Sequence, residues 1–157
     1  MELFTCNASI KPTTSVVTIN QRVKLMPDKE KGPDNPIKLL LVDDEAGYVS
    51  VLAKRMTKRN IDTITATNGN EAIQTLRGHR FDCAVLDLKM EDIDGIEVLK
   101  IFKKMDPAMP VIMLTGHGSE TAAREGVKAG AFDYLTKPCD LDDLIEIICE
   151  ACNREVP

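Results

Sequence analysis

Several short apolar runs in this chain each end at a polar residue whose side chain suits phosphoryl chemistry. Asp43 and Asp44 follow the first run, Asp87 follows a later one, and Thr115 and Lys137 follow two more. Carboxylates bind hard divalent cations, a hydroxyl and an ammonium can hold phosphoryl oxygens, and one carboxylate is left as a nucleophile. These residue types at these positions therefore predict metal-assisted phosphoryl transfer.

The apolar runs themselves are typical of strands that are buried on both faces of a parallel sheet. We expect strands at residues 37–42, 61–66, 83–86, 111–114 and, more weakly, 134–135. Helical periodicity is clear at Val49, Leu52, Ala53 and Met56, and again at Leu141, Leu144, Ile145 and Ile148. The alternation predicts an α/β fold with a doubly wound parallel sheet, built from five β/α units with right-handed crossovers.

Helix boundaries are marked by capping residues and prolines. Asn68 and Ser119 are expected to cap the second and fourth helices, Asp106-Pro107 to close the third, and Asp140 to begin the last. In such a sheet, ligands bind outside the carboxyl ends of the strands. The polar residues that follow the strands should therefore meet in one crevice.

Clustered carboxylates raise one another's pKa unless a cation offsets their charge. The site therefore calls for Mg²⁺ or Mn²⁺, with Lys137 as an internal counter-charge. We expect Asp44 and Asp87 as direct ligands, Asp43 as a ligand acting mainly through water, and the backbone carbonyl of Lys89 as a further ligand. Taken singly, Asp43 or Asp44 is explained equally well as a helix cap, and Asp87 as a loop acid.

The length, composition and net charge of the chain exclude several classes of protein. At 157 residues and 43% hydrophobic content, the chain suits one α/β domain plus a tail. A formal net charge of −5 argues against a surface that binds nucleic acid. No apolar run approaches the roughly 20 residues of a membrane-spanning helix, and the first residues lack a signal-peptide pattern, so we expect a soluble cytoplasmic protein.

Residues 1–36 are rich in polar residues and turn formers, and we interpret them as a flexible tail before a domain at 37–157. An isolated strand near Ser15 is the alternative, and whether Met26 is the natural start stays open. The cysteines are expected to be reduced. Cys149 and Cys152 have the spacing of a metal or redox pair, but no second pair completes a zinc site.

The motifs around these residues carry a resemblance. They are Leu41-Val42-Asp43-Asp44-Glu45, Val85-Leu86-Asp87-Leu88-Lys89-Met90 with Asp94-Gly95, Leu114-Thr115-Gly116, and Gly130-Ala131-Phe132-Asp133-Tyr134-Leu135-Thr136-Lys137-Pro138. In this order and spacing, the chain from about Ile37 to Asn153 resembles the receiver domain of bacterial two-component response regulators.

The resemblance implies a flavodoxin-like five-stranded parallel sheet in the order 2-1-3-4-5. It also implies that Asp87 accepts a phosphoryl group from a histidine kinase or phosphotransfer protein, with Mg²⁺ required and acetyl phosphate as an alternative donor. The domain would be a signalling switch rather than an enzyme. Thr115 would move toward the phosphoryl group, Tyr134 would turn inward, and the Lys137-Pro138 bond would be cis.

By the same resemblance, the face formed by the fourth helix, fifth strand and fifth helix would bind partners or a second copy. Few residues follow the last predicted helix, so we expect no output domain and a separate, unidentified downstream protein. An aspartyl-nucleophile phosphatase is a competing interpretation, but it needs an acid where Lys89 stands. A receiver fold that acts only as an interaction module, without phosphorylation, is another.

Three residues depart from, or add to, the family pattern. Glu91 follows Met90 where a proline is usual, which predicts a more flexible loop after Asp87. Lys89 and His117 flank the path that a hydrolytic water would take. We hypothesise that both hinder this water and prolong the life of the phosphoryl group.

Dephosphorylation should therefore be slower in the wild type than in a Lys89→Asn, His117→Glu double variant, and a faster loss in the wild type would contradict the hypothesis.

Overall fold

The computed structural model describes residues 35–116 and 120–156, all within the compact unit Pro33–Pro157. In this part of the chain, five parallel strands form one sheet in the order β2-β1-β3-β4-β5. The strands are β1 (Ile37–Val42), β2 (Ile61–Ala66), β3 (Cys83–Leu86), β4 (Val111–Thr115) and β5 (Asp133–Thr136). The expected α/β class and strand order are confirmed.

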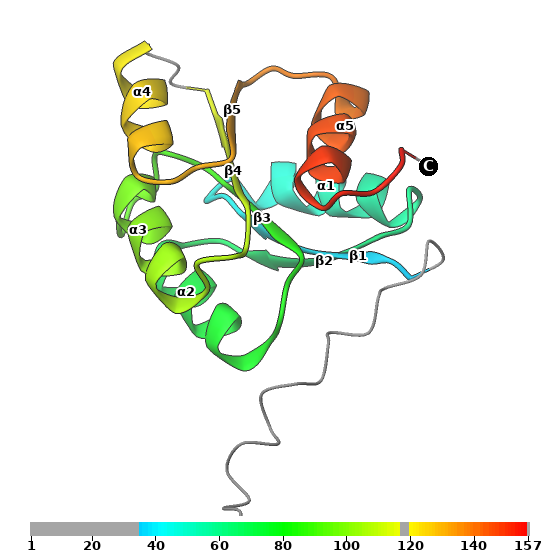
Figure 1. Ribbon diagram of the computed structural model, residues 1–157, viewed down its shortest axis with the longest axis horizontal. Coiled ribbons are helices and arrows are strands. Elements are labelled where there is room, and N and C mark those ends of the chain that lie inside the picture. Colours follow the sequence, from blue (N-terminus) through cyan, green and yellow to red (C-terminus); the bar gives the residue numbers. More distant parts are fainter. Residues whose placement is uncertain (1–34, 117–119, 157) are drawn as a thin grey trace, which may run out of the picture. The chain divides into compact units, whose positions relative to one another are not determined.

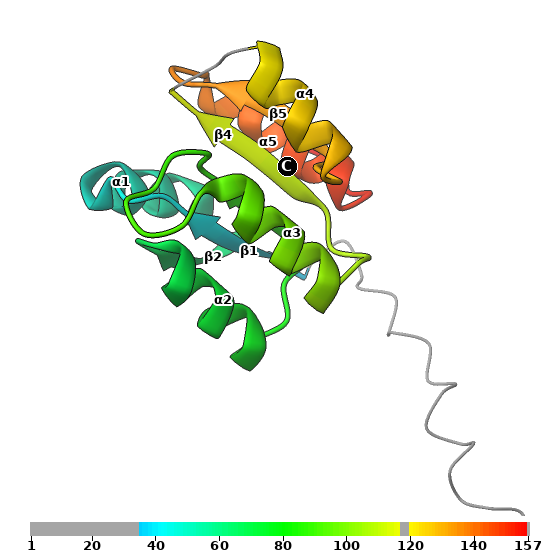
Figure 2. The same ribbon diagram turned by 90° about the vertical axis from the view of Figure 1, so that its left-hand side faces the viewer.

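Helices cover both faces of the sheet. They are α1 (Ala46–Thr57), α2 (Gly69–Gly78), α3 (Gly95–Met105), α4 (Glu120–Lys128) and α5 (Leu141–Ala151). In Figure 1, α1 and α5 lie on one side of the sheet, and α2, α3 and α4 lie on the other. Figure 2 shows these last three helices in a row, with α3 in the middle.

Each strand contributes to two hydrophobic cores, because its side chains alternate between the faces. Leu39 and Leu41 of β1 pack in the core beneath α1 and α5, whereas Leu40 and Val42 pack in the core beneath α2 and α3. Burial on both faces explains why residues 39–42 of this strand are all apolar, whereas Lys38 near its start is exposed.

Most expected boundaries agree with the structure within one or two residues. Asn68 caps α2, since its side chain accepts a hydrogen bond from the backbone N–H of Glu71 at 2.8 Å. The last helix begins one residue after Asp140, and β5 is longer than expected. Ser119 and the proposed tail lie outside the described residues, apart from Asn35 and Pro36, so the domain boundary at residue 37 stays a prediction.

No disulfide joins the cysteines in the described residues, which are Cys83, Cys139, Cys149 and Cys152. Cys149 is buried in α5, and Cys152 lies just beyond the end of that helix. Neither belongs to a group of potential metal ligands in the described part of the chain. Among the described helices, none combines the length and the hydrophobicity that a membrane span requires.

Gly95, the first residue of α3, allows the chain to fold back tightly after β3. Its backbone N–H donates a hydrogen bond to the carbonyl of Leu88 at 2.8 Å. A Cβ atom at this position would lie 2.2 Å from the carbonyl oxygen of Asp87 and 2.8 Å from the Cα atom of Leu88. Only glycine fits here without a shift of the backbone beside Asp87.

We expect Gly95→Ala to lower the free energy of unfolding by roughly 1–3 kcal/mol, the usual cost of overpacking. Urea denaturation measures the change. Gly47→Ala is the control, because no atom lies within 4 Å of the added Cβ in α1. That control should stabilise the protein by about 0.5 kcal/mol through better helix propensity. Equal effects of the two variants would contradict the steric argument.

Candidate functional site

Parallel pairing brings the predicted polar residues to one edge of the sheet. Val42 at the end of β1 is in register with Leu86 at the end of β3. The hydrogen bonding continues past the strands, because the N–H of Asp87 donates to the carbonyl of Val42 at 2.9 Å. Likewise, the N–H of Lys137 donates to the carbonyl of Thr115 at 2.8 Å. The residues that follow the strands are thus fixed beside one another by backbone bonds.

Three carboxylates meet at this edge. One oxygen each from Asp43, Asp44 and Asp87 lies within 4.8 Å of the others, and no comparable group occurs elsewhere in the described residues. Asp43 and Asp87 are buried, whereas Asp44 is exposed. Atom Oδ1 of Asp87 is buried and has no hydrogen-bond partner among the described residues. An unpartnered acceptor within a set of hard oxygen donors fits a divalent cation such as Mg²⁺.

Lys137 supplies the positive charge inside the cluster. Its Nζ atom lies 2.5 Å from Oδ2 of Asp43, 3.5 Å from Oε1 of Glu45 and 3.9 Å from Oδ2 of Asp87. The same atom lies 4.5 Å from the centroid of the Tyr48 ring, in cation–π geometry. Burial alone would lower the pKa of Lys137, but its hydrogen bond to Asp43 and the neighbouring acidic charges outweigh burial and raise the pKa. The ammonium therefore stays charged at neutral pH.

Glu45 and Tyr48 were not predicted as site residues. Glu45 appeared only within the acidic motif that begins the site, and Tyr48 lies on the first turn of α1. No periodicity of charge or hydrophobicity distinguishes a tyrosine beneath an ammonium from an ordinary helix residue. Their proximity to Lys137 emerges only from the three-dimensional structure.

Asp87 is held in an environment that disfavours its charge. Burial raises its pKa above the ordinary aspartate value, even though Lys137 and a hydrogen bond with the Thr115 side chain act in the opposite direction. The negative charge of Asp43 adds to the rise. A bound cation would relieve this unfavourable charge state.

The two expected switch residues lie close to Asp87. Thr115 is fully buried at the end of β4. The Tyr134 hydroxyl is buried without a hydrogen-bond partner among the described residues, and its ring packs against the core beneath α2 and α3. Burial and the charge of Asp87 raise the pKa of Tyr134. The structure thus brings both side chains near the acidic cluster.

A shallow hollow of about 360 Å³ opens above the carboxylates. Its lining comprises Asp44, Glu45, Asp87, Lys89, Met90, Glu91, Gly116 and Lys137. Gly116 is exposed at the rim, and the Lys137-Pro138 peptide bond is cis, as the resemblance implied. His117 lies outside the described residues, so its expected place beside the hollow stays a prediction.

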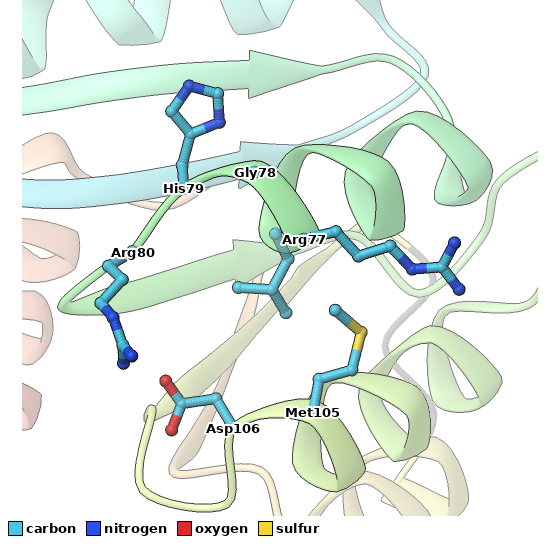
Figure 3. A pocket seen from close by; sticks show the side chains of 7 residues that line it. Arg77, Gly78, His79, Arg80, Met105 and Asp106 are labelled. Atoms are coloured by element: carbon cyan, nitrogen blue, oxygen red, sulfur yellow. The ribbon is translucent and has the colours of Figure 1, made fainter. Parts of the chain in front are cut away.

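A second hollow, of about 590 Å³, lies where α2 and α3 end. It is lined by Leu76, Arg77, Gly78, His79, Arg80, Met105 and Asp106. In Figure 3, Arg80 extends toward Asp106, whereas the guanidinium of Arg77 extends away from that residue. This lining has a single carboxylate, Asp106, and therefore lacks the cluster of acidic oxygens that a divalent cation requires. The larger hollow is therefore not the site of the phosphoryl chemistry.

Comparison with known proteins agrees with this geometry. The transcriptional regulatory protein GlrR of Escherichia coli strain K12 is 38% identical to the chain over 122 residues, which are 78% of this chain and 28% of GlrR. The chain thus spans little more than a quarter of that relative's length.

Solved structures show the same likeness. The Francisella response regulator 1452 receiver domain is 34% identical, with a TM-score of 0.70, over 74% of this chain and 97% of that one. A CheY-like receiver domain protein from Methanospirillum hungatei JF-1 is 28% identical, with a TM-score of 0.73, over 76% of this chain and 95% of that one. The family model for the response regulator receiver domain matches residues 39–149. The chain therefore belongs to the response regulator receiver domain family.

Proposed function

We propose that Asp87 accepts a phosphoryl group from the phosphohistidine of a sensor histidine kinase or phosphotransfer protein. The observation that carries this proposal is the buried Asp87 carboxylate, with one oxygen unpartnered, inside a cluster of three carboxylates and beside an ammonium. A carboxylate oxygen attacks phosphorus, an acyl phosphate bond forms, and the phosphorus–nitrogen bond breaks. The bonding electron pair leaves with the imidazole nitrogen of the donor.

The surrounding residues have distinct roles in this proposal. Asp44, Asp87 and the Lys89 carbonyl hold Mg²⁺ or Mn²⁺, and Asp43 acts mainly through water. The cation would neutralise charge on the transferring phosphoryl oxygens. Lys137 and Thr115 bind those oxygens from the protein side. Small phosphodonors such as acetyl phosphate serve as substitutes for the kinase. The protein then takes the phosphoryl group onto its own Asp87 and does not turn over a separate substrate.

Signalling would follow from a local change of charge at Asp87. Thr115 and Tyr134 lie close enough to respond to it, and Tyr134 belongs to β5. The α4-β5-α5 face is the surface through which we expect a downstream protein or a second copy to bind. Two apolar side chains in this region of the chain, Val127 on α4 and Phe132 just before β5, are exposed. With a formal net charge of −5, the chain is not expected to bind nucleic acid directly.

The curated relatives bear on the output step. GlrR is a transcriptional regulatory protein that extends well beyond the matched region. Output through a separate protein is our proposal for this chain, and an output domain in the same polypeptide, as the greater length of GlrR suggests, is the alternative. Both begin with the same event at Asp87.

Intact mass after incubation with acetyl phosphate tests the phosphorylation. We expect the wild type to gain one phosphoryl group with Mg²⁺ present and none after EDTA treatment. Asp87→Asn should gain none under either condition, because it lacks the nucleophilic carboxylate. Asp62→Asn is the matched control, since it makes the same change of charge at an exposed position of β2 and should behave as the wild type. A gain by Asp87→Asn would contradict the proposal.

The pH dependence of stability tests the charge state of Asp87 in EDTA. Because the pKa of Asp87 is raised on folding, the native state binds more protons than the unfolded state between the two pKa values. Its contribution to stability therefore falls as the pH rises through that window, which begins near an ordinary aspartate pKa of about 3.9. Asp87→Asn should be more stable than the wild type at neutral pH, and the difference should vanish toward pH 4. Urea denaturation that shows a constant difference would contradict this.

A further inference from the structure

The loop between β3 and α3 is tied to the rest of the domain at two points. At its base, the N–H of Gly95 bonds the carbonyl of Leu88 at 2.8 Å. Near its tip, Asp92 reaches across to the first turn of α2. The residues between the two ties, Lys89, Met90 and Glu91, all line the hollow above Asp87.

Asp92 makes three hydrogen bonds to α2. Its Oδ1 atom accepts from the N–H of Gly69 at 3.0 Å. Its Oδ2 atom accepts from the N–H and the side-chain amide of Asn70, both at 3.0 Å. A carboxylate bonded to amides at a helix N-terminus is stabilised by charge-assisted bonds and by the helix dipole. Desolvation alone would raise the pKa of Asp92, but the N–H groups of Gly69 and Asn70 outweigh it and lower the pKa.

Helix α2 already has a cap of its own. Asn68 accepts a hydrogen bond from the N–H of Glu71 at 2.8 Å, and the Glu71 carboxylate accepts from the N–H of Thr67 at 2.7 Å. Asp92 satisfies two further amides that water would otherwise solvate. Asp92 therefore matters to the loop as well as to the helix, because its bonds connect the loop to α2.

Close packing supports the same contact. A Cβ atom on Gly69 would lie 2.8 Å from Cγ2 of Val98 and 3.2 Å from Cβ of Ile93. The missing side chain lets the first turn of α2 approach the loop and the start of α3. The sequence predicted a more flexible loop because Glu91 replaces the usual proline. That flexibility stays a prediction, and in the structure the bonds of Asp92 connect the loop to α2.

From this arrangement we infer that Asp92 is a positioning residue for the cation site. By fixing the loop to α2, it keeps the backbone carbonyl of Lys89 in place beside Asp87. This inference rests on the proposed function, in which that carbonyl binds the metal. Asp92 itself is directed toward α2 and is not a ligand in this proposal.

Calorimetric titration with Mg²⁺ tests the inference on the full chain, at a temperature where circular dichroism shows every variant folded. Asp92→Asn keeps the shape of the side chain but turns an amide donor toward the N–H groups of α2. We expect its dissociation constant for Mg²⁺ to rise roughly tenfold, as when an outer-shell partner of a metal site is lost. Asn70→Ala removes one of the three bonds and should show a smaller rise.

Asn68→Ala is the matched control, because it weakens the cap of the same helix without touching the loop. It should lower the stability of the protein but leave the affinity for Mg²⁺ unchanged. Phosphorylation of Asp92→Asn by acetyl phosphate should approach the wild-type rate at saturating Mg²⁺, since only the metal site is loosened. A general folding defect would not weaken Mg²⁺ binding while leaving the phosphorylation rate at saturating Mg²⁺ close to that of the wild type.

The possible outcomes distinguish the positioning role of Asp92 from the proposed function of the site. Wild-type affinity in Asp92→Asn, or an equal loss of affinity in Asn68→Ala, would overturn the positioning role while leaving the proposed function intact. A wild type that binds no Mg²⁺ would contradict the proposed function and this inference together. A selective loss in Asp92→Asn and a smaller loss in Asn70→Ala would establish the positioning role.

Discussion

The ion pair between Asp43 and Lys137 is the constraint on which the rest of the site depends. Asp43 is 2% exposed, and removing one partner of a buried pair leaves a charge that costs about 3–5 kcal/mol. Lys137 cannot also neutralise Asp44 and Asp87, so the cluster keeps an excess of negative charge. A divalent cation would relieve that excess, and in the proposed function the same ammonium binds the phosphoryl oxygens.

The sheet makes this concentration of charge tolerable. Parallel strands covered by helices on both faces supply two hydrophobic cores, and these cores stabilise the fold away from the acidic edge. Backbone hydrogen bonds from Asp87 to Val42, and from Lys137 to Thr115, then hold the polar residues beside one another. The position of the loop after Asp87 depends on two further residues, Gly95 at the start of α3 and Asp92, which bonds to α2.

The pattern of apolar runs was sufficient to predict the α/β class and the members of the acidic cluster, because both follow from where these runs stop. The order of the strands was an implication of the family resemblance. Strands β1, β2 and β3 begin and end where the periodicity indicated. The half-buried β5 gave a weaker signal and is longer than expected. Asp92 gave no signal at all, since an exposed acid in a loop has the same composition whether or not it caps a neighbouring helix. Such contacts depend on the packing of α2 against α3, which no local pattern encodes.

The most direct test of the account is to locate the phosphoryl group chemically. An acyl phosphate is reduced by borohydride to an alcohol, whereas a phosphate ester on a hydroxyl is not. After incubation with Mg²⁺ and acetyl phosphate, reduction and peptide sequencing by mass spectrometry should find homoserine at position 87 alone. Homoserine at position 43 or 44, or a phosphate ester on Thr115, would contradict the assignment of Asp87 as the acceptor.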